Sequence, residues 1–171
     1  MAVSTFLDTS VLLAGLIDLG PQSVPAQSLM QAVTDGRVRT PATAWHCCLE
    51  FFSVATRLPP EFRLTPADAV TLLEHEVFAR MAVHDLPAAD RLGLLRAAAH
   101  DSIAGGRVYD AHIAEIARAV RASVVVTDNR KHFLSALRYD MRVETPAEFL
   151  TTINQQRPSL GGSDRQSSDE P

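Results

Sequence analysis

Two acidic positions in this sequence directly follow short apolar runs that are typical of buried β-strands. Asp8 follows Val3–Leu7, and Asp128 with Asn129 follows the β-branched run Ser123–Thr127. In a parallel sheet both strands end at the same edge, which is where open α/β sheets place their sites. Each position also has a structural alternative, because Asp8 can cap the next helix and Asp-Asn is common in turns.

A third acid, Asp110, lies at the start of a helix expected over Val108–Val120. It precedes Ile113 by three residues, so it lies on or near the buried face of that helix, one turn earlier. The alternative is a favourable negative charge in the first helical turn, which stabilises a helix by about 0.3–1 kcal/mol. The spacing supports a functional role without excluding the structural one.

The fourth acid, Glu50, is the only one in the helix expected over Ala42–Leu58. With His46, Ser53 and Arg57 it forms a polar stripe at helical spacing. Such a stripe can face either water or a cleft. The expected core stripe of the same helix consists of Trp45, Cys48, Leu49, Phe52 and Ala55.

Carboxylates brought together from these positions would repel one another unless a cation offset their charge. Oxygen ligands of this kind suit Mg²⁺, with Mn²⁺ as an alternative. A hard ion in an open acidic cleft can orient a phosphodiester, activate water and stabilise the leaving oxygen. No serine or cysteine with a nearby base is apparent, and Cys47 and Cys48 lie in an apolar run, so a covalent intermediate is not expected. The acids therefore predict metal-dependent phosphodiester hydrolysis.

The elements that must position these acids alternate along the chain. Strands are expected over Val3–Leu7, Val38–Thr40, Met81–His84, Ser123–Thr127 and Met141–Glu144. Helices are expected over Val11–Leu19, Val24–Thr34 and Ala42–Leu58, from Thr65 to about Phe78, from Asp85 to about Ala99, and over Val108–Val120, Lys131–Leu137 and Thr145–Ile153. This alternation predicts an α/β layer fold with a mainly parallel sheet.

The composition suits one domain with a sizeable core, since the chain has 171 residues and is 46% hydrophobic. The net charge of −4 gives no global electrostatic case for nucleic-acid binding, although a local basic groove is compatible with it. Residues 1–153 are expected to form the domain, and residues 154–171, rich in Gln, Ser, Gly and Asp, a disordered tail. With no apolar run long enough for a membrane span and no basic region before one, a cytoplasmic location is expected.

Four segments carry a family resemblance by their order and spacing. They are Phe6-Leu7-Asp8-Thr9-Ser10-Val11, the helix with Glu50, Tyr109-Asp110-Ala111-His112-Ile113-Ala114, and Val126-Thr127-Asp128-Asn129-Arg130-Lys131-His132-Phe133. Over about residues 2–150 the chain resembles PIN-domain ribonucleases, specifically VapC-type toxins of bacterial type II toxin–antitoxin pairs. The resemblance implies a single α/β domain, a sheet flanked by helices, and an acidic Mg²⁺ pocket at the edge of that sheet.

The resemblance also implies roles for individual residues. Asp8, Glu50 and Asp110 match the family's three main acids. The family's Thr-x-Asp or Thr-x-Asn register places the fourth position at Asn129, whereas chemistry favours Asp128, because a carboxylate holds Mg²⁺ better than an amide does. Successive residues of an extended strand end should not both point inward, and the sequence leaves this choice open.

Further residues surround this set. The expected hydroxyl supports are Thr9, Ser10 and Thr127. The candidates for contact with RNA phosphates are Arg130 and Lys131, with a solvated turn as their alternative, and Arg107 and Arg118 are weaker candidates. The histidines, among them His46, His112 and His132, are expected to be surface or structural residues.

The resemblance implies an endoribonuclease toxin with an RNA substrate, a cognate antitoxin protein that wraps the toxin, and a homodimer of toxin chains. Exposed apolar faces on the first helices would be the docking surface. One rival, a phosphatase with a nucleophilic aspartate, would want a second Asp where Ser10 stands. The other rival, a catalytically inactive PIN-like module that binds RNA or a protein, stays open because the fourth site position is ambiguous.

Overall fold

A five-stranded, all-parallel sheet forms the centre of the protein in the computed structural model, which describes residues 4–133 and 140–155. Its strands are β1 (Thr5–Leu7), β2 (Pro41–Ala44), β3 (Ala82–His84), β4 (Val124–Val126) and β5 (Arg142–Glu144). The order across the sheet is β3-β2-β1-β4-β5. Leu7 of β1 pairs with Val126 of β4, so Asp8 and Thr127 leave the sheet side by side at its carboxyl edge.

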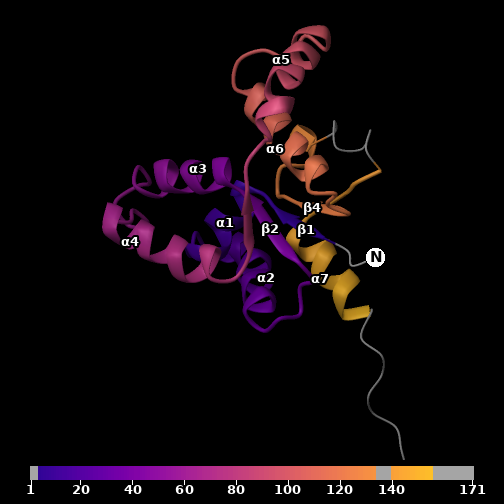
Figure 1. The fold of residues 1–171 in the computed structure, drawn as a ribbon. Helices are drawn as coiled ribbons and strands as arrows, with labels where there is room; N and C mark the ends of the chain where they lie inside the picture. Colours follow the sequence, from indigo (N-terminus) through magenta and orange to yellow (C-terminus); the bar gives the residue numbers. More distant parts are fainter. Residues whose placement is uncertain (1–3, 134–139, 156–171) are drawn as a thin grey trace, which may run out of the picture.

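Helices connect the strands and cover the sheet (Figure 1). The α-helices are α1 (Thr9–Leu16), α2 (Val24–Thr34), α3 (Trp45–Ala55), α4 (Pro66–Leu72), α5 (Arg91–His100), α6 (Arg107–Ala119) and α7 (Pro146–Gln155). The shorter helices are the 3₁₀ turns η1 (Pro21–Ser23) and η3 (Ala88–Asp90) and the π-helix η2 (Leu73–Phe78). Connections between parallel strands are right-handed. The connections from β1 to β2 and from β2 to β3 therefore place α1–α4 on one face of the sheet. The connection from β3 back across the sheet to β4 places α5 and α6 on the other face. In Figure 1, α3 and α4 accordingly lie on the left of the strands and α6 on their right.

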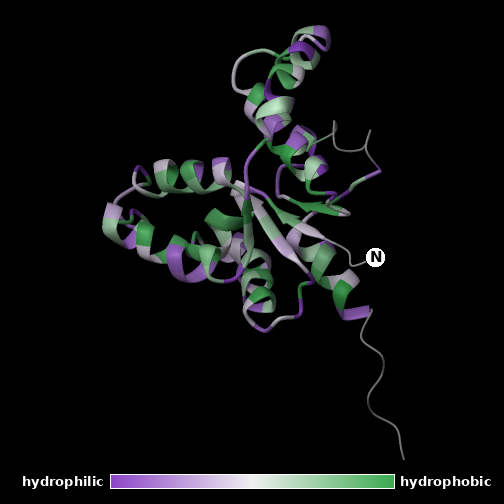
Figure 2. Ribbon diagram, viewed as in Figure 1, coloured by the Kyte–Doolittle hydropathy of each residue, from purple (hydrophilic) through white to green (hydrophobic). Residues whose placement is uncertain are grey.

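The core lies between the sheet and these helices. β1 and β4 are fully buried, as expected for central strands of a parallel sheet, and β4 is coloured as hydrophobic in Figure 2. The apolar stripe predicted for α6 is confirmed, since Ile113, Ile116 and Ala117 are buried. Because α6 packs against β2, this contact helps to place Asp110 at the sheet.

The predicted second strand is wrong in its position. Val38–Thr40 was expected to be the strand and Ala42 to begin a helix, but the strand is β2, Pro41–Ala44, and α3 begins only at Trp45. Proline is tolerated as the first residue of a strand, and β2 is bonded on both sides, to β1 and β3. Its Pro-Ala-Thr-Ala sequence is pale in Figure 2 and has no β-branched run, so pattern alone gives it little signal.

The residues of α3 that form the core also differ from the predicted stripe. Cys48 and Ala55 are buried as predicted, together with Cys47 and Phe51. Trp45 and Leu49, predicted as core residues, are 44% and 51% exposed. The buried face of α3 is thus offset from the predicted stripe by about one residue, which leaves Trp45 and Leu49 on the exposed side.

The end of the chain is described only in part. The helix α7 continues to Gln155, so Asn154 and Gln155 belong to it and not to the expected tail. Residues 156–171, the rest of that tail, and 134–139, which contain most of the helix expected over Lys131–Leu137, lie outside the described residues. Across residues 4–133 and 140–155, no helix combines the length and the apolar character that crossing a bilayer requires.

Candidate active site

Asp8 is a buried carboxylate at the carboxyl edge of the sheet, with 6% of the residue exposed. It stands at the N-cap position of α1, but its side chain makes no capping hydrogen bond. Its Oδ2 instead accepts hydrogen bonds from Ser10 Oγ at 3.0 Å and Thr127 Oγ1 at 2.8 Å. Burial raises the pKa of Asp8 despite these bonds, and the nearby charge of Glu50 raises it further. The capping role considered for Asp8 is therefore not the role of its carboxylate.

Glu50 approaches the same edge from α3. Thr9 Oγ1 donates to Glu50 Oε2 at 2.6 Å, which ties α3 to the start of α1. The members of the polar stripe of α3 have two different surroundings. Its later members, Ser53 and Arg57, bond to each other at the surface, where Arg57 Nε donates to the Ser53 carbonyl oxygen. Glu50, the member that bonds to Thr9, belongs to the site.

Asp110 lies in the first turn of α6, on the third side of the site. Its Oδ2 is 3.2 Å from His132 Nδ1. Partial burial raises the pKa of Asp110, the charge and hydrogen bond of His132 oppose this shift, and the charge of Glu50 adds to it. Because Glu50 raises the pKa of both Asp8 and Asp110, the three carboxyl groups share one electrostatic environment.

The adjacent residues Asp128 and Asn129 have different surroundings. The backbone N–H of Asp128 donates to Ser10 Oγ at 3.1 Å, and that of Asn129 donates to Thr127 Oγ1 at 2.9 Å. The side chain of Asn129 reaches His132, with 3.0 Å between Asn129 Nδ2 and His132 Nδ1. Asp128 is an exposed residue whose pKa is raised by partial desolvation alone. Both residues are exposed, so their hydrogen bonds, and not their exposure, distinguish them.

These residues surround one cavity of about 570 Å³, which we call the acidic cavity. It is lined by Asp8, Thr9, Ser10, Leu13, Glu50, Gly106, Arg107, Tyr109, Asp110, Asn129 and His132. Three of the four predicted acids line it, namely Asp8, Glu50 and Asp110, and so does Asn129, whereas Asp128 does not. Thr127 supports it from below through its bond to Asp8.

The sequence that builds this fold matches a known family. The PIN domain matches this chain over residues 4–131, which is most of its length. The chain belongs to the PIN-domain family.

Individual relatives agree with this assignment. Ribonuclease VapC27 from Mycobacterium tuberculosis is 38% identical to this PIN domain over 92 residues, which are 54% of this chain and 65% of the relative. The match therefore spans slightly less than two thirds of that protein. Two solved structures share the fold. One, described as the Sarcin-Ricin loop cleaving toxin VapC20 of Mycobacterium tuberculosis, has a TM-score of 0.56 and 16% identity, with 71% of this chain and 87% of that chain covered. The other, VapBC2 from Rickettsia felis bound to a DNA fragment from their promoter, has a TM-score of 0.57 and 17% identity over 84% and 98%.

The basic residues near the acidic cavity of this PIN domain have different surroundings. Neither Arg130 nor Lys131 lines the acidic cavity, and Arg130 Nη1 is 2.8 Å from Glu148 Oε1. Arg107, a weaker candidate, lines the cavity from the start of α6. His132, expected to be structural, contacts both Asp110 and Asn129. One signal was available for His132, because it follows Asn129 by three residues and a single helical turn places such residues on one side.

The donor set fits a hard divalent cation. Carboxylates at Asp8, Glu50 and Asp110 and the amide of Asn129 offer oxygen ligands, which Mg²⁺ and Mn²⁺ prefer. Within the described ranges, 4–133 and 140–155, no three His, Cys, Asp or Glu side chains stand as one cluster ready to hold an ion. Each carboxylate is instead held by a different partner: Asp8 by Ser10 and Thr127, Glu50 by Thr9, and Asp110 by His132.

The two cysteines offer no alternative nucleophile. Both are buried in the core on the inner face of α3. Burial raises the pKa of Cys47 to about 12 and that of Cys48 to about 11, so both thiols stay protonated at neutral pH. This agrees with their expected role as core residues.

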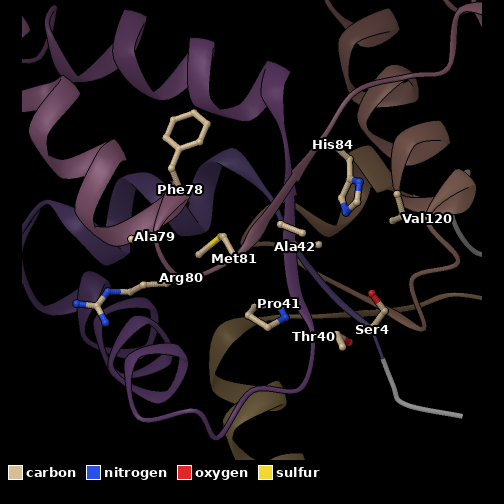
Figure 3. A pocket seen from close by; sticks show the side chains of 11 residues that line it. Ser4, Thr40, Pro41, Ala42, Phe78, Ala79, Arg80, Met81, His84 and Val120 are labelled. Atoms are coloured by element: carbon tan, nitrogen blue, oxygen red, sulfur yellow. The ribbon is translucent and has the colours of Figure 1, made fainter.

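A second cavity, of about 640 Å³, lies mainly where β1, β2 and β3 begin (Figure 3). We call it the second cavity. Its lining consists of Ser4, Thr40, Pro41, Ala42, Phe78, Ala79, Arg80, Met81, Ala82, His84 and Val120. No carboxylate is among these residues, and Arg80 is bonded to Glu76 outside the lining.

Proposed function

We propose that this PIN domain is a Mg²⁺-dependent endoribonuclease that acts as the toxin of a toxin–antitoxin pair and hydrolyses RNA phosphodiester bonds. The observation that carries this proposal is the meeting of Asp8, Glu50, Asp110 and Asn129 in one open cavity at the carboxyl edge of the sheet. The relative VapC27 is named a ribonuclease and VapC20 a toxin that cleaves the Sarcin-Ricin loop, which supports the reaction class and the role.

The chain prepares this site by holding each acid before a substrate arrives. Asp8 is fixed by the Ser10 and Thr127 hydroxyls, and Glu50 by Thr9. His132 orients Asp110, and Asn129 is aligned by its N–H bond to Thr127. Asp8, Glu50, Asp110 and the amide oxygen of Asn129 would hold the cation. When bound, Mg²⁺ supplies charge stabilisation for the phosphodiester and makes a hydrolytic water more acidic.

The same geometry supports a choice between two adjacent residues at the fourth site position. Asn129 lines the acidic cavity and contacts His132, whereas Asp128 contributes its backbone N–H to Ser10. We therefore propose Asn129 as the fourth site residue and give Asp128 a supporting role. Thr9, Ser10 and Thr127 act as the hydroxyl supports.

The partners proposed here are an RNA substrate, an antitoxin protein and a second toxin chain, all in the cytoplasm. Large apolar side chains available for a protein partner include Trp45 and Leu49 on α3, Phe78 at the end of η2, and Leu92 and Leu95 on α5. α1, by contrast, is largely covered, because it packs against α2 and α3. The exposed faces thus lie mainly on α3, η2 and α5.

The deciding experiment is cleavage of a broad RNA pool by the purified full chain in Mg²⁺ and in EDTA. We expect cleavage in Mg²⁺ only, and its loss in Asp8→Asn and Asp110→Asn. The matched control is Glu61→Gln, because Glu61 is an exposed acid outside the cavity. Cleavage by both site variants at the parental rate would refute the acidic-site assignment.

A second readout separates metal binding from catalysis. Mg²⁺ or Mn²⁺ should raise the melting temperature of the parent and of Glu61→Gln, because a ligand that binds only the folded state stabilises it. The same ions should have little effect on Asp8→Asn. A parent that neither cuts RNA nor responds to either ion, yet binds RNA or a protein tightly, would be the catalytically inactive module.

A further inference from the structure

Three aromatic side chains form a cluster where α3 and α6 meet. His46, in the first turn of α3, stacks on Tyr109, in the first turn of α6, with 5.2 Å between ring centroids and 20° between ring planes. His112 meets His46 edge-on at 5.4 Å. The cluster thus joins the two helices that supply acids to the site.

The cluster lies beside the acids. Tyr109 lines the acidic cavity and directly precedes Asp110 in the sequence, and His46 precedes Glu50 by one helical turn. Arg107 lines the same cavity from the preceding half-turn of α6. An aromatic surface, a cation and the acids therefore share one opening.

Tyr109 is held in place and is also accessible. His46 covers one face of its ring, but the residue remains 56% exposed. Among the exposed aromatic residues, Trp45 and Phe78 contact each other at 6.2 Å on η2 and α3, away from the acidic cavity. Tyr109, in contrast, is an exposed aromatic residue that lines the acidic cavity.

We propose that the His46–Tyr109 pair is a stacking platform for one nucleobase of the RNA substrate, next to the phosphodiester that is cleaved. Single-stranded RNA is recognised largely by stacking its splayed bases on aromatic side chains, because the bases offer flat π-faces and the protein offers rigid rings. Stacking on His46 orients the Tyr109 ring in advance. The Arg107 guanidinium at the same opening offers a charge to the RNA backbone. This inference rests on the proposed function and adds a specificity-determining contact to it.

The test compares two short single-stranded probes of equal charge, oligoadenylate and the corresponding abasic ribose-phosphate strand. Binding is measured by fluorescence anisotropy with the full chain in an Asp8→Asn background, which prevents cleavage, at fixed Mg²⁺ and ionic strength. The measured quantity is the Kd of the abasic strand divided by the Kd of oligoadenylate. This ratio isolates the contribution of the bases from that of the phosphates. We expect Tyr109→Ala and Tyr109→Leu to reduce this ratio by about tenfold, the size of one lost stacking contact.

Matched variants keep the result interpretable. Tyr109→Phe and Tyr109→Trp retain a ring and should keep the parental ratio, and Tyr109→Leu retains the bulk without the ring. His46→Ala should lower the ratio less than Tyr109→Ala does. Phe78→Ala removes another exposed aromatic ring, outside the acidic cavity, and should leave the ratio unchanged.

Several results would overturn the platform. The parent could bind both strands equally, or Tyr109→Ala could lose the same affinity for both strands. The Kd ratio could also stay unchanged in Tyr109→Leu, or fall in Phe78→Ala as much as in Tyr109→Ala. Cleavage by the chain with intact Asp8 is measured in parallel. A parent that cuts no RNA but shows a Tyr109-dependent ratio loses the proposed hydrolysis and keeps the platform. A parent that cuts RNA with a ratio independent of Tyr109 loses only the platform.

Discussion

The acidic cavity and the second cavity lie on the same sheet and enclose similar volumes, about 570 and 640 Å³, but only the first is lined by carboxylates. The acidic cavity lies where strands end and is lined by three carboxylates, each held by a hydroxyl or a histidine. The second lies mainly where strands begin, and its lining carries no carboxylate. Volume therefore does not identify the site in this fold. Direction along the parallel strands does, because side chains beyond the carboxyl ends converge there.

The largest expected effect comes from comparing one variant in each of the two cavities. Glu50→Gln should lower kcat/KM for RNA cleavage by about 10²–10³-fold, the usual loss when one charge-stabilising group is removed. His84→Ala, which changes the lining of the second cavity, should stay within about twofold of the parent. Both are measured by steady-state cleavage of one labelled RNA. If His84→Ala proves as damaging as Glu50→Gln, the functional distinction between the cavities fails.

The next effect tests whether Asp128 or Asn129 occupies the fourth position of the proposed site. Asn129→Ala should lower kcat/KM by about 10–100-fold, because it removes an oxygen donor and the contact to His132. Asp128→Ala keeps the backbone N–H that bonds Ser10 and should cost only about twofold. The same cleavage assay decides. The reverse ranking of the two variants would place the carboxylate of Asp128, not the amide of Asn129, at the site.

Much of this contrast could be predicted from the sequence, and the reasons are local. Asp8 and the Asp128-Asn129 pair follow unmistakable apolar runs, and the topology of a parallel sheet brings such ends together. Asp110 precedes a regular apolar stripe, which fixes its side of α6. For Glu50 the pattern allowed either water or a cleft, and only the family resemblance favoured the cleft.

The rest depended on tertiary contacts that no local pattern records. β2 begins with proline and contains no β-branched run, so its place in the sheet is determined by its neighbours. Arg107 and His132 line the acidic cavity because of where α6 and the turn after β4 lie in space. Likewise, the choice between Asp128 and Asn129 depends on which backbone N–H meets Ser10 and which meets Thr127.

Two buried threonines sharpen the comparison further, since Thr43 and Thr127 are both fully buried. Thr127 Oγ1 donates to Asp8, whereas Thr43 Oγ1 donates to the Leu7 carbonyl oxygen at 2.8 Å within the sheet. Thr127→Val should therefore lower kcat/KM by roughly tenfold, as the loss of a support to a metal-site residue does. Thr43→Val should lower the free energy of unfolding by about 1 kcal/mol with cleavage nearly unchanged.

Steady-state cleavage and urea unfolding, measured on both threonine variants, separate these roles. A Thr43→Val variant that folds stably but loses as much cleavage as Thr127→Val would show that the hydroxyl bond to Asp8 has no special place in the site. The two side chains are otherwise matched in type, burial and substitution.

The smallest expected effect is thermodynamic and follows from the burial of Asp8. Because the folded pKa of Asp8 is raised above its ordinary value of 3.8, the native state binds a proton more readily than the unfolded state does. In EDTA, stability should therefore increase as pH falls from neutral through the folded pKa, and the ionised carboxylate should destabilise the protein at pH 7. Asp8→Asn removes that charge and should raise the melting temperature at pH 7 by roughly 2–4 °C per kcal/mol gained.

Mg²⁺ should reverse this ranking, and the reversal distinguishes a metal site from a merely buried acid. At a concentration tenfold above its Kd, the ion stabilises the parent by about 1.4 kcal/mol and leaves Asp8→Asn nearly unchanged. Thermal unfolding is measured for both proteins in EDTA and in Mg²⁺, with Glu61→Gln as the control. The comparison uses the four melting temperatures of the parent and Asp8→Asn. A parent that is more stable than Asp8→Asn without any ion would mean that the Ser10 and Thr127 bonds outweigh the desolvation of Asp8. That result would contradict the predicted pH dependence, whereas a parent that Mg²⁺ does not stabilise would contradict the metal site.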